Sequence, residues 1–124
     1  MKGTSKMHKT IIYLAGPITG VEDYKERFAK KEARFLNTPE DEPQIVLNPA
    51  RLLEGLEDED CMAICLKLVE MANVVVLLEG WEKSPGAIIE ALYAWRQGIP
   101  VIEDKGDYGK LLRWDTEEHW FKEA

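Results

Sequence analysis

Val74-Val75-Val76-Leu77-Leu78 is the stretch that decides the fold. Its β-branched and apolar residues suit both faces of a strand, as in the central strand of a parallel sheet that is covered on both sides. The Gly- and Pro-rich segment 80–86 follows and predicts a loop. Ser84 and Pro85 are typical of the N-cap and first residue of a helix, and we expect that helix to continue through Glu90.

Further strands and helices are expected on both sides of this unit. The apolar run 10–15 predicts a buried strand that ends in Gly16-Pro17-Ile18-Thr19-Gly20. Aromatic residues at helical spacing predict a helix over 24–36, a polar loop follows at 37–43, and 44–47 is a short strand. Apolar residues from Met62 to Met71 predict an amphipathic helix, and 98–102 ends the Glu90 helix and supplies a fourth strand.

Alternation of strand and helix predicts an α/β fold of the flavodoxin or Rossmann-like kind. We expect one domain over 1–124, with a parallel sheet of about four to five strands and helices on both faces. Right-handed crossovers favour the strand order 2-1-3-4. The tail 103–124 is less regular: 105–109 has the composition of a loop, and Trp114, Trp120 and Phe121 either close the core or join a partner subunit.

Composition indicates a soluble cytoplasmic protein. The chain has 124 residues, 45% hydrophobic and 31% charged, with a net charge of -7, which argues against binding of a nucleic-acid polymer. No apolar stretch approaches the roughly 20 residues of a membrane span. Cys61 and Cys65 are too few for a disulfide framework and lack partners for a zinc site, so we expect buried thiols, no metal and no cofactor.

Two loops are expected to meet at one edge of the sheet. In the predicted strand order, 16–20 and 80–86 leave the carboxyl ends of neighbouring strands, where open α/β sheets bind ligands. The second loop adds a helix N-terminus, whose free N–H groups and dipole suit an anion such as phosphate.

Glu90 is the one carboxylate in the otherwise apolar run 87–95, and no Lys or Arg lies three or four residues away. It is either a structural carboxylate that is paired elsewhere or reaches solvent, or a functional group held beside the anion site. The second reading fits glycosidic chemistry, in which a carboxylate attacks the anomeric carbon of a sugar through an oxocarbenium-like transition state.

Three motifs in order give the chain a resemblance to a known family: Tyr13-Leu14-Ala15-Gly16-Pro17, Ala72-Asn73-Val74-Val75-Val76-Leu77 and Ser84-Pro85-Gly86-Ala87-Ile88-Ile89-Glu90. Over positions 10 to 102 it resembles the nucleoside 2-deoxyribosyltransferase superfamily. The match is strongest with a small, often phage-associated branch of uncharacterised proteins. Such proteins would act on a nucleoside or nucleotide, and we expect a homo-oligomer.

The resemblance implies that Glu90 is the catalytic nucleophile and that Tyr13 orients it. It also implies that Ser84, six residues before the nucleophile, binds the phosphate of a nucleoside 5'-monophosphate. Two positions depart from the family pattern: Thr19 stands for an Arg of the phosphate loop, and Asn73 stands for an Asp. Because Asn cannot act as a carboxylic acid, departure of the base would need water or another carboxylate, such as Asp23 or Glu82.

Eight positions are therefore candidates for binding substrate: Gly16, Pro17, Thr19, Gly20, Asn73, Trp81, Ser84 and Gly86. Structural alternatives exist for several of them. Tyr13 suits a β-strand core, Ser84 suits an N-cap without any ligand, and Trp81 either stacks on a base or covers the core. Two functions follow: an N-glycosidase or deoxyribosyltransferase, or a nucleotide-binding or regulatory protein that uses the same crevice without turnover.

Overall fold

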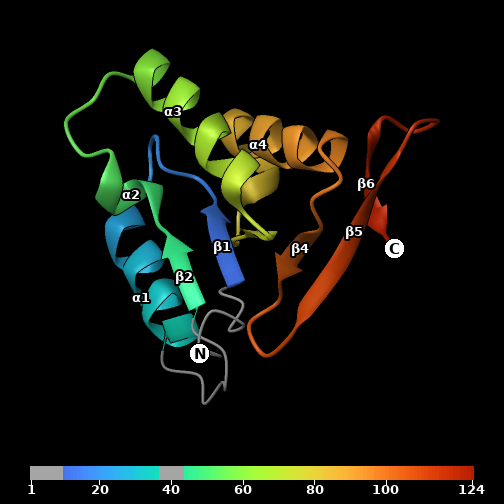
Figure 1. Cartoon of the computed structure of the whole chain (residues 1–124), viewed down its shortest axis with the longest axis horizontal. Coiled ribbons are helices and arrows are strands. Elements are labelled where there is room, and N and C mark those ends of the chain that lie inside the picture. Colours follow the sequence, from blue (N-terminus) through green and yellow to red (C-terminus); the bar gives the residue numbers. More distant parts are fainter. Residues whose placement is uncertain (1–9, 37–43) are drawn as a thin grey trace, which may run out of the picture.

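A six-stranded sheet with helices on both faces forms the body of the protein (Figure 1). The computed structural model describes residues 10–36 and 44–124, so the loop expected at 37–43 lies outside the described residues. The strands are β1 (Thr10–Ala15), β2 (Gln44–Leu47), β3 (Val74–Leu77), β4 (Val101–Asp104), β5 (Gly109–Asp115) and β6 (Trp120–Glu123).

The strand order is β2-β1-β3-β4-β5-β6, and the first four strands pair in parallel. This confirms the predicted α/β fold and the predicted order 2-1-3-4. The expected strand count of four to five is wrong, because the tail adds β5 and β6 as an antiparallel hairpin. The hairpin extends away from the helices at one side of the sheet (Figure 1).

The tail was hard to predict because its turn does not use the usual residues. The hairpin reverses at 116–119 without Gly or Asn, and His119 takes the positive φ of 54° that such a turn needs. The Asp115 carboxylate accepts hydrogen bonds from the N–H groups of Glu117 and Glu118, which closes the turn. Lys110 lies on one face of β5 and Arg113 and Asp115 lie on the other, so neither face of the strand is continuously apolar.

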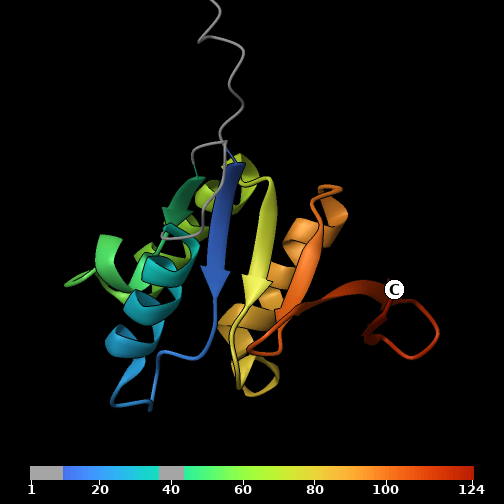
Figure 2. The same ribbon diagram turned by 90° about the horizontal axis from the view of Figure 1, so that it is seen from below.

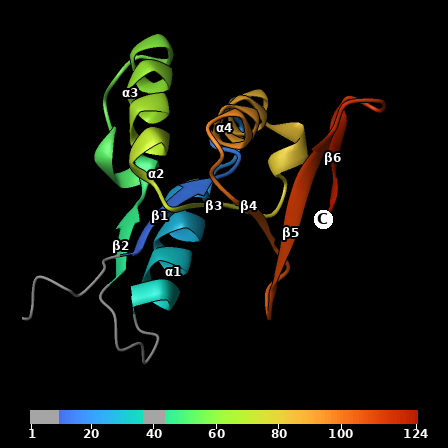
Figure 3. The same cartoon turned by 45° about the vertical axis from the view of Figure 1, so that its right-hand side comes forward.

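Helices cover the two faces of the sheet unequally. The helices are α1 (Tyr24–Leu36), α2 (Pro49–Leu52), α3 (Asp58–Met71) and α4 (Pro85–Arg96), with a short 3-10 turn η2 (Trp81–Lys83). Figure 3 shows α3 and α4 on one face of the sheet and α1 on the other.

Among helices within 10–36 and 44–124, none combines the length and the apolar character needed to cross a bilayer.

Alternation along β1 divides the core between these faces. Tyr13 and Ala15 belong to the cluster under α3 and α4, whereas Ile12 and Leu14 pack with Phe28 of α1. All five are buried, as expected for a parallel strand covered on both sides. The position of Tyr13 in this alternation directs its side chain toward α4.

Candidate active site

The loops after β1 and β3 meet at the carboxyl ends of their strands, as predicted. The Leu78 N–H donates to the Ala15 carbonyl at 2.8 Å, which joins the two strands where they end. A Cβ added to Gly80 would lie 3.3 Å from Cγ of Pro17, so the loops are in close contact. Gly80 also has a φ of +87°, which a side chain would strain. Figure 2 shows both loops leaving the same edge of the sheet.

The N-terminus of α4 lies at this edge of the sheet. Ser84 is the N-cap, as predicted, and its Oγ accepts from the Ala87 N–H at 3.2 Å. Pro85 has no N–H. The N–H of Gly86 has no hydrogen-bond acceptor among the described residues. Because a hydroxyl can accept and donate at once, the Ser84 O–H and the Gly86 N–H are two donors suited to an anion.

Helical spacing places Glu90 on the inner face of α4. Its neighbours on that face are Ala87, Ala91 and Ala94, whose small side chains bring the helix close to the sheet. Glu90 is 7% exposed, and its Oε2 accepts a hydrogen bond of 2.9 Å from the buried Tyr13 hydroxyl. The apolar sequence around Glu90 therefore reflects real burial, and the partner of the carboxylate comes from β1.

Burial raises the pKa of Glu90 to about 7, and hydrogen bonds from Tyr13 and Cys65 oppose that rise. Burial also raises the pKa of the Cys65 thiol to about 12, and it raises the pKa of Tyr13 still further, with the nearby Glu90 charge adding to it. Both donors are therefore neutral at physiological pH. The Glu90 carboxylate has no compensating cation in this network, and it changes protonation state close to pH 7.

Replacing Tyr13 by Phe should raise the pKa of Glu90 above 7. The change removes the hydroxyl that donates to Oε2 and leaves the ring in place. A hydrogen bond to a charged group contributes about 1.5–3 kcal/mol, which corresponds to a rise of roughly one to two pH units. Titration of the Glu90 side-chain carbon by NMR measures it. Tyr93→Phe is the matched control, because the Tyr93 hydroxyl bonds to Glu70 instead. An unchanged Glu90 midpoint in Tyr13→Phe contradicts the role of the hydroxyl.

Asn73 lies away from the two loops. It precedes β3 at the amino end of the strand, where its Oδ1 accepts from the Ile11 N–H at 2.8 Å. Its own N–H donates to the Ile11 carbonyl, also at 2.8 Å. These bonds tie the beginnings of β1 and β3 together, so the structure gives Asn73 a structural task and does not bring it to the carboxyl edge.

Trp81 is buried between the loop and the C-terminal hairpin. Its ring stacks on Trp120 with centroids 5.4 Å apart, meets the edge of Phe121, and its Nε1 donates to Glu103 at 2.8 Å. Trp114 in turn packs edge-on against Phe121. The tail aromatics thus close the core of this chain, and a contact of Trp81 with a nucleobase remains a prediction.

Some site residues were not singled out from the sequence. Cys65 shares a helical face with Met62 and Val69, a pattern that predicts only burial. Glu79, directly after the β3 region, was overlooked because an exposed charge at a strand end is common. The structure places Glu79 at the carboxyl edge, whereas Thr19 and Gly20 are exposed in the loop after β1.

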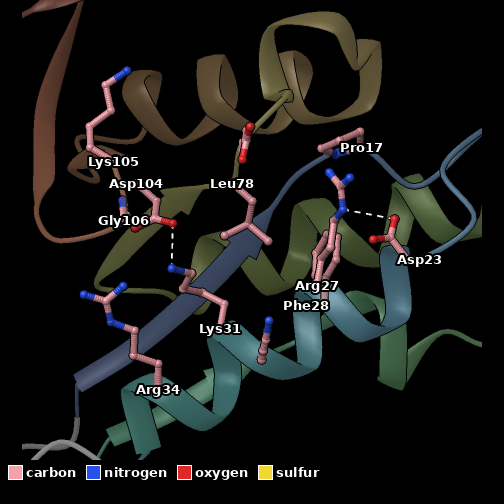
Figure 4. Close-up of a pocket in the computed structure, with 12 residues that line it drawn as sticks. Pro17, Asp23, Arg27, Phe28, Lys31, Arg34, Leu78, Asp104, Lys105 and Gly106 are labelled. Atoms are coloured by element: carbon pink, nitrogen blue, oxygen red, sulfur yellow. Dashed lines mark hydrogen bonds and ion pairs between the residues drawn. The ribbon is translucent and has the colours of Figure 1, made fainter.

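A cavity of about 850 Å3 begins at the same edge but extends over the α1 face of the sheet. Figure 4 shows Leu78 at its centre, with Pro17 on one side and the Lys31–Asp104 ion pair on the other. Glu90 does not line this cavity, because its side chain belongs to the α4 face. The molecule therefore presents two distinct environments, the Glu90 network and the α1 cavity.

Comparison with solved structures finds a protein of the same fold. The CMP N-glycosidase BcmB of Clostridium botulinum is 17% identical, with a TM-score of 0.53 over 80% of this chain and 74% of that chain. No curated protein matches the chain. A family profile described as a domain of unknown function matches residues 10–103, from the start of β1 into β4. That range contains both loops and the Glu90 network, and the chain is a member of this family, DUF4406.

Proposed function

We propose that the protein cleaves the N-glycosidic bond of a nucleoside 5'-monophosphate or nucleoside, with Glu90 as nucleophile. The observation that carries the proposal is a buried carboxylate, held by the Tyr13 hydroxyl, on the helix whose N-terminus offers Ser84 and Gly86 as donors. The fold shared with a CMP N-glycosidase supports an activity of this class.

In the proposed reaction, the ionised Glu90 carboxylate attacks C1' of the sugar. The C1'–N bond breaks, its electron pair leaves with the base, and a glycosyl ester forms on Glu90. Water then attacks C1' and releases a proton to solvent, the C1'–O bond of the ester breaks, and the carboxylate is restored. If a second base attacks in place of water, the same intermediate gives transfer. With a pKa of about 7, Glu90 is ionised in a large fraction of molecules at neutral pH, while burial keeps the carboxylate poorly solvated.

The departing base needs a proton, and Asn73 is at the wrong end of β3 to supply it. Asp23 is engaged with Arg27 in an ion pair of 3.0 Å. Glu79 and Glu82 are both exposed near the carboxyl edge. Water or one of these two carboxylates is therefore the proposed proton source.

The helix N-terminus predicts that 5'-monophosphates bind more tightly than the matching nucleosides. One charge-assisted hydrogen bond contributes roughly 1.5–3 kcal/mol, or about ten- to a hundredfold in affinity. Calorimetry on a nucleoside and its monophosphate measures the difference. Ser84→Ala should reduce the preference, whereas Ser84→Thr keeps the hydroxyl and should retain it. Equal affinities for nucleoside and monophosphate count against a phosphate site at α4.

A nucleotide-binding protein without turnover is the second candidate. Its support is the 7% exposure of Glu90, since a substrate sugar must displace side chains to reach that carboxylate. In this reading the loops hold a nucleotide and the Glu90 network only stabilises α4 against β1.

One experiment separates these functions. The protein is incubated with a panel of nucleosides and nucleoside 5'-monophosphates, and free base is quantified by chromatography. Release of base from at least one nucleotide supports the glycosidase. Nucleotide binding without any release supports the second candidate.

Three finer expectations belong to the same proposal. Cys65 is a buried thiol, in keeping with the proposed cytoplasmic location. A homo-oligomer and a place in the small phage-associated branch of the superfamily are the other two. Sedimentation of the purified protein tests the oligomer.

A further inference from the structure

The cavity on the α1 face has a charge opposite to that of the chain. Five cationic and three anionic side chains line it, a net charge of +2, whereas the whole chain carries -7. Its volume of about 850 Å3 lies in the range of roughly 300–1,000 Å3 that small-molecule sites occupy. A cleft lined mainly by one sign of charge raises the local concentration of ligands of the opposite sign.

Two of these cations have no ion pair within the part of the chain that the structure describes. Arg27 pairs with Asp23 at 3.0 Å and Lys31 with Asp104 at 2.7 Å. Lys30 and Arg34 have no ion pair with any residue of the described ranges 10–36 and 44–124. They stand four residues apart on α1, where like charges face each other and repel. An anion held between them would relieve that repulsion.

A third cation approaches from another element. Lys105 follows β4, pairs loosely with Glu103 at 3.5 Å, and lines the cavity together with Gly106, whose N–H donates to Asp104. Figure 4 shows Lys105 and Gly106 on the same side of the cavity as Lys31 and Arg34. Cations from a helix and from a separate turn therefore line the same cavity.

The floor of the cavity is apolar. Leu78 at the end of the β3 region is 6% exposed and reaches the cavity, while Phe28 of α1, which is 0% exposed, packs in the same cluster beneath it. An apolar floor with a cationic rim suits a ligand that has an uncharged flat part and several separated negative charges. Guanidinium and ammonium groups spaced along a helix match the oxygens of consecutive phosphates better than a single carboxylate.

We propose that this cavity binds a small organic anion with two or more phosphate groups, of the nucleoside polyphosphate class, at a site separate from Glu90. The site uses Lys30, Arg34 and Lys105 for the phosphates and the Leu78 floor for the uncharged part. It does not depend on the proposed glycosidase activity, because Glu90 and Ser84 belong to the other environment.

Calorimetry at low salt tests the site with ATP, inorganic triphosphate and adenosine as probes, without divalent metal. ATP should bind best, triphosphate more weakly and adenosine least. The double variant Lys30→Glu/Arg34→Glu should weaken ATP binding at least about tenfold. Lys67→Glu/Arg96→Glu is the matched control: it changes the net charge equally at exposed positions on α3 and α4 and should keep the affinity.

Ser84→Ala and Glu90→Gln separate this site from the proposed active site, and both should retain ATP binding. Three results would overturn the proposal: no binding of ATP, an equal loss in the two charge-reversal variants, or a loss in Ser84→Ala that is absent from Lys30→Glu/Arg34→Glu. The last of these would place ATP at the α4 N-terminus. Because binding is the readout, an inactive glycosidase leaves the test intact.

Discussion

Glu90→Gln should lower the rate of base release by at least about a thousandfold, because the amide removes the attacking oxygen and keeps nearly the same shape. The Tyr13 hydroxyl can still donate to the remaining carbonyl oxygen, so the packing of α4 against β1 is preserved. Binding of the monophosphate should change little, since it relies on Ser84 and Gly86 at the N-terminus of α4, one to two turns before Glu90. Initial rates of base release with the best nucleotide of the panel, together with calorimetry of the same nucleotide, measure both effects.

Glu117→Gln, at an exposed turn position outside the site, is the matched control for that experiment and should retain the activity. Full activity in Glu90→Gln would refute the covalent mechanism. Loss of nucleotide binding together with activity would instead show that the substitution disturbs the crevice.

Glu90→Gln should also make the protein more stable than the wild type at pH 8. The pKa of Glu90 is about 7 in the fold against an ordinary value of 4.5, so the folded state prefers the protonated acid. The stability that this preference provides is present below pH 4.5 and is lost as the pH rises through 7. The difference between the two pKa values corresponds to about 3 kcal/mol of stability, which the wild type loses as the pH rises. Glu90→Gln has no carboxyl group to ionise at this position and does not lose it. The gain amounts to roughly 10 °C in melting temperature for a domain of this size.

Thermal unfolding of the wild type and of Glu90→Gln at pH 5 and at pH 8 measures this effect. The variant's advantage should grow between the two pH values, and constant costs of the new amide cancel in that comparison. Glu117→Gln, at an exposed turn position, is the control and should follow the wild type. An advantage of Glu90→Gln that stays the same from pH 5 to pH 8 contradicts the raised pKa.

Local patterns were sufficient to predict the parallel half of the sheet. Val74 to Leu77 are apolar on both faces, and this pattern together with right-handed crossovers leads to the observed order of β2, β1, β3 and β4. The N-cap at Ser84 was predictable for the same reason, since Ser followed by Pro has one strong local preference. The antiparallel hairpin was not, because His119 replaces the usual Gly and the strand faces are mixed.

The hydrogen bond from Tyr13 to Glu90 was predicted from the family resemblance, whereas the contribution of Cys65 is visible only in the fold. Tyr13 and Glu90 are 77 positions apart, so no local pattern links them. Cys65 joins them from α3 because that helix packs beside α4, a contact that depends on the whole topology. Asn73 was a substrate-binding candidate because of its family position, but it precedes β3, at the amino end of that strand, where its side chain accepts from Ile11.

Trapping of the glycosyl ester on Glu90 tests the central claim most directly. A 2'-deoxy-2'-fluoro nucleoside 5'-monophosphate destabilises the oxocarbenium-like transition state and slows hydrolysis of the ester, so the intermediate accumulates. The protein is incubated with this analogue of the best nucleotide, digested and analysed by mass spectrometry. The account predicts one equivalent of released base and a fluorinated sugar phosphate on the peptide at Glu90, absent from Glu90→Gln. Base release with no adduct, or an adduct on another residue, would contradict it.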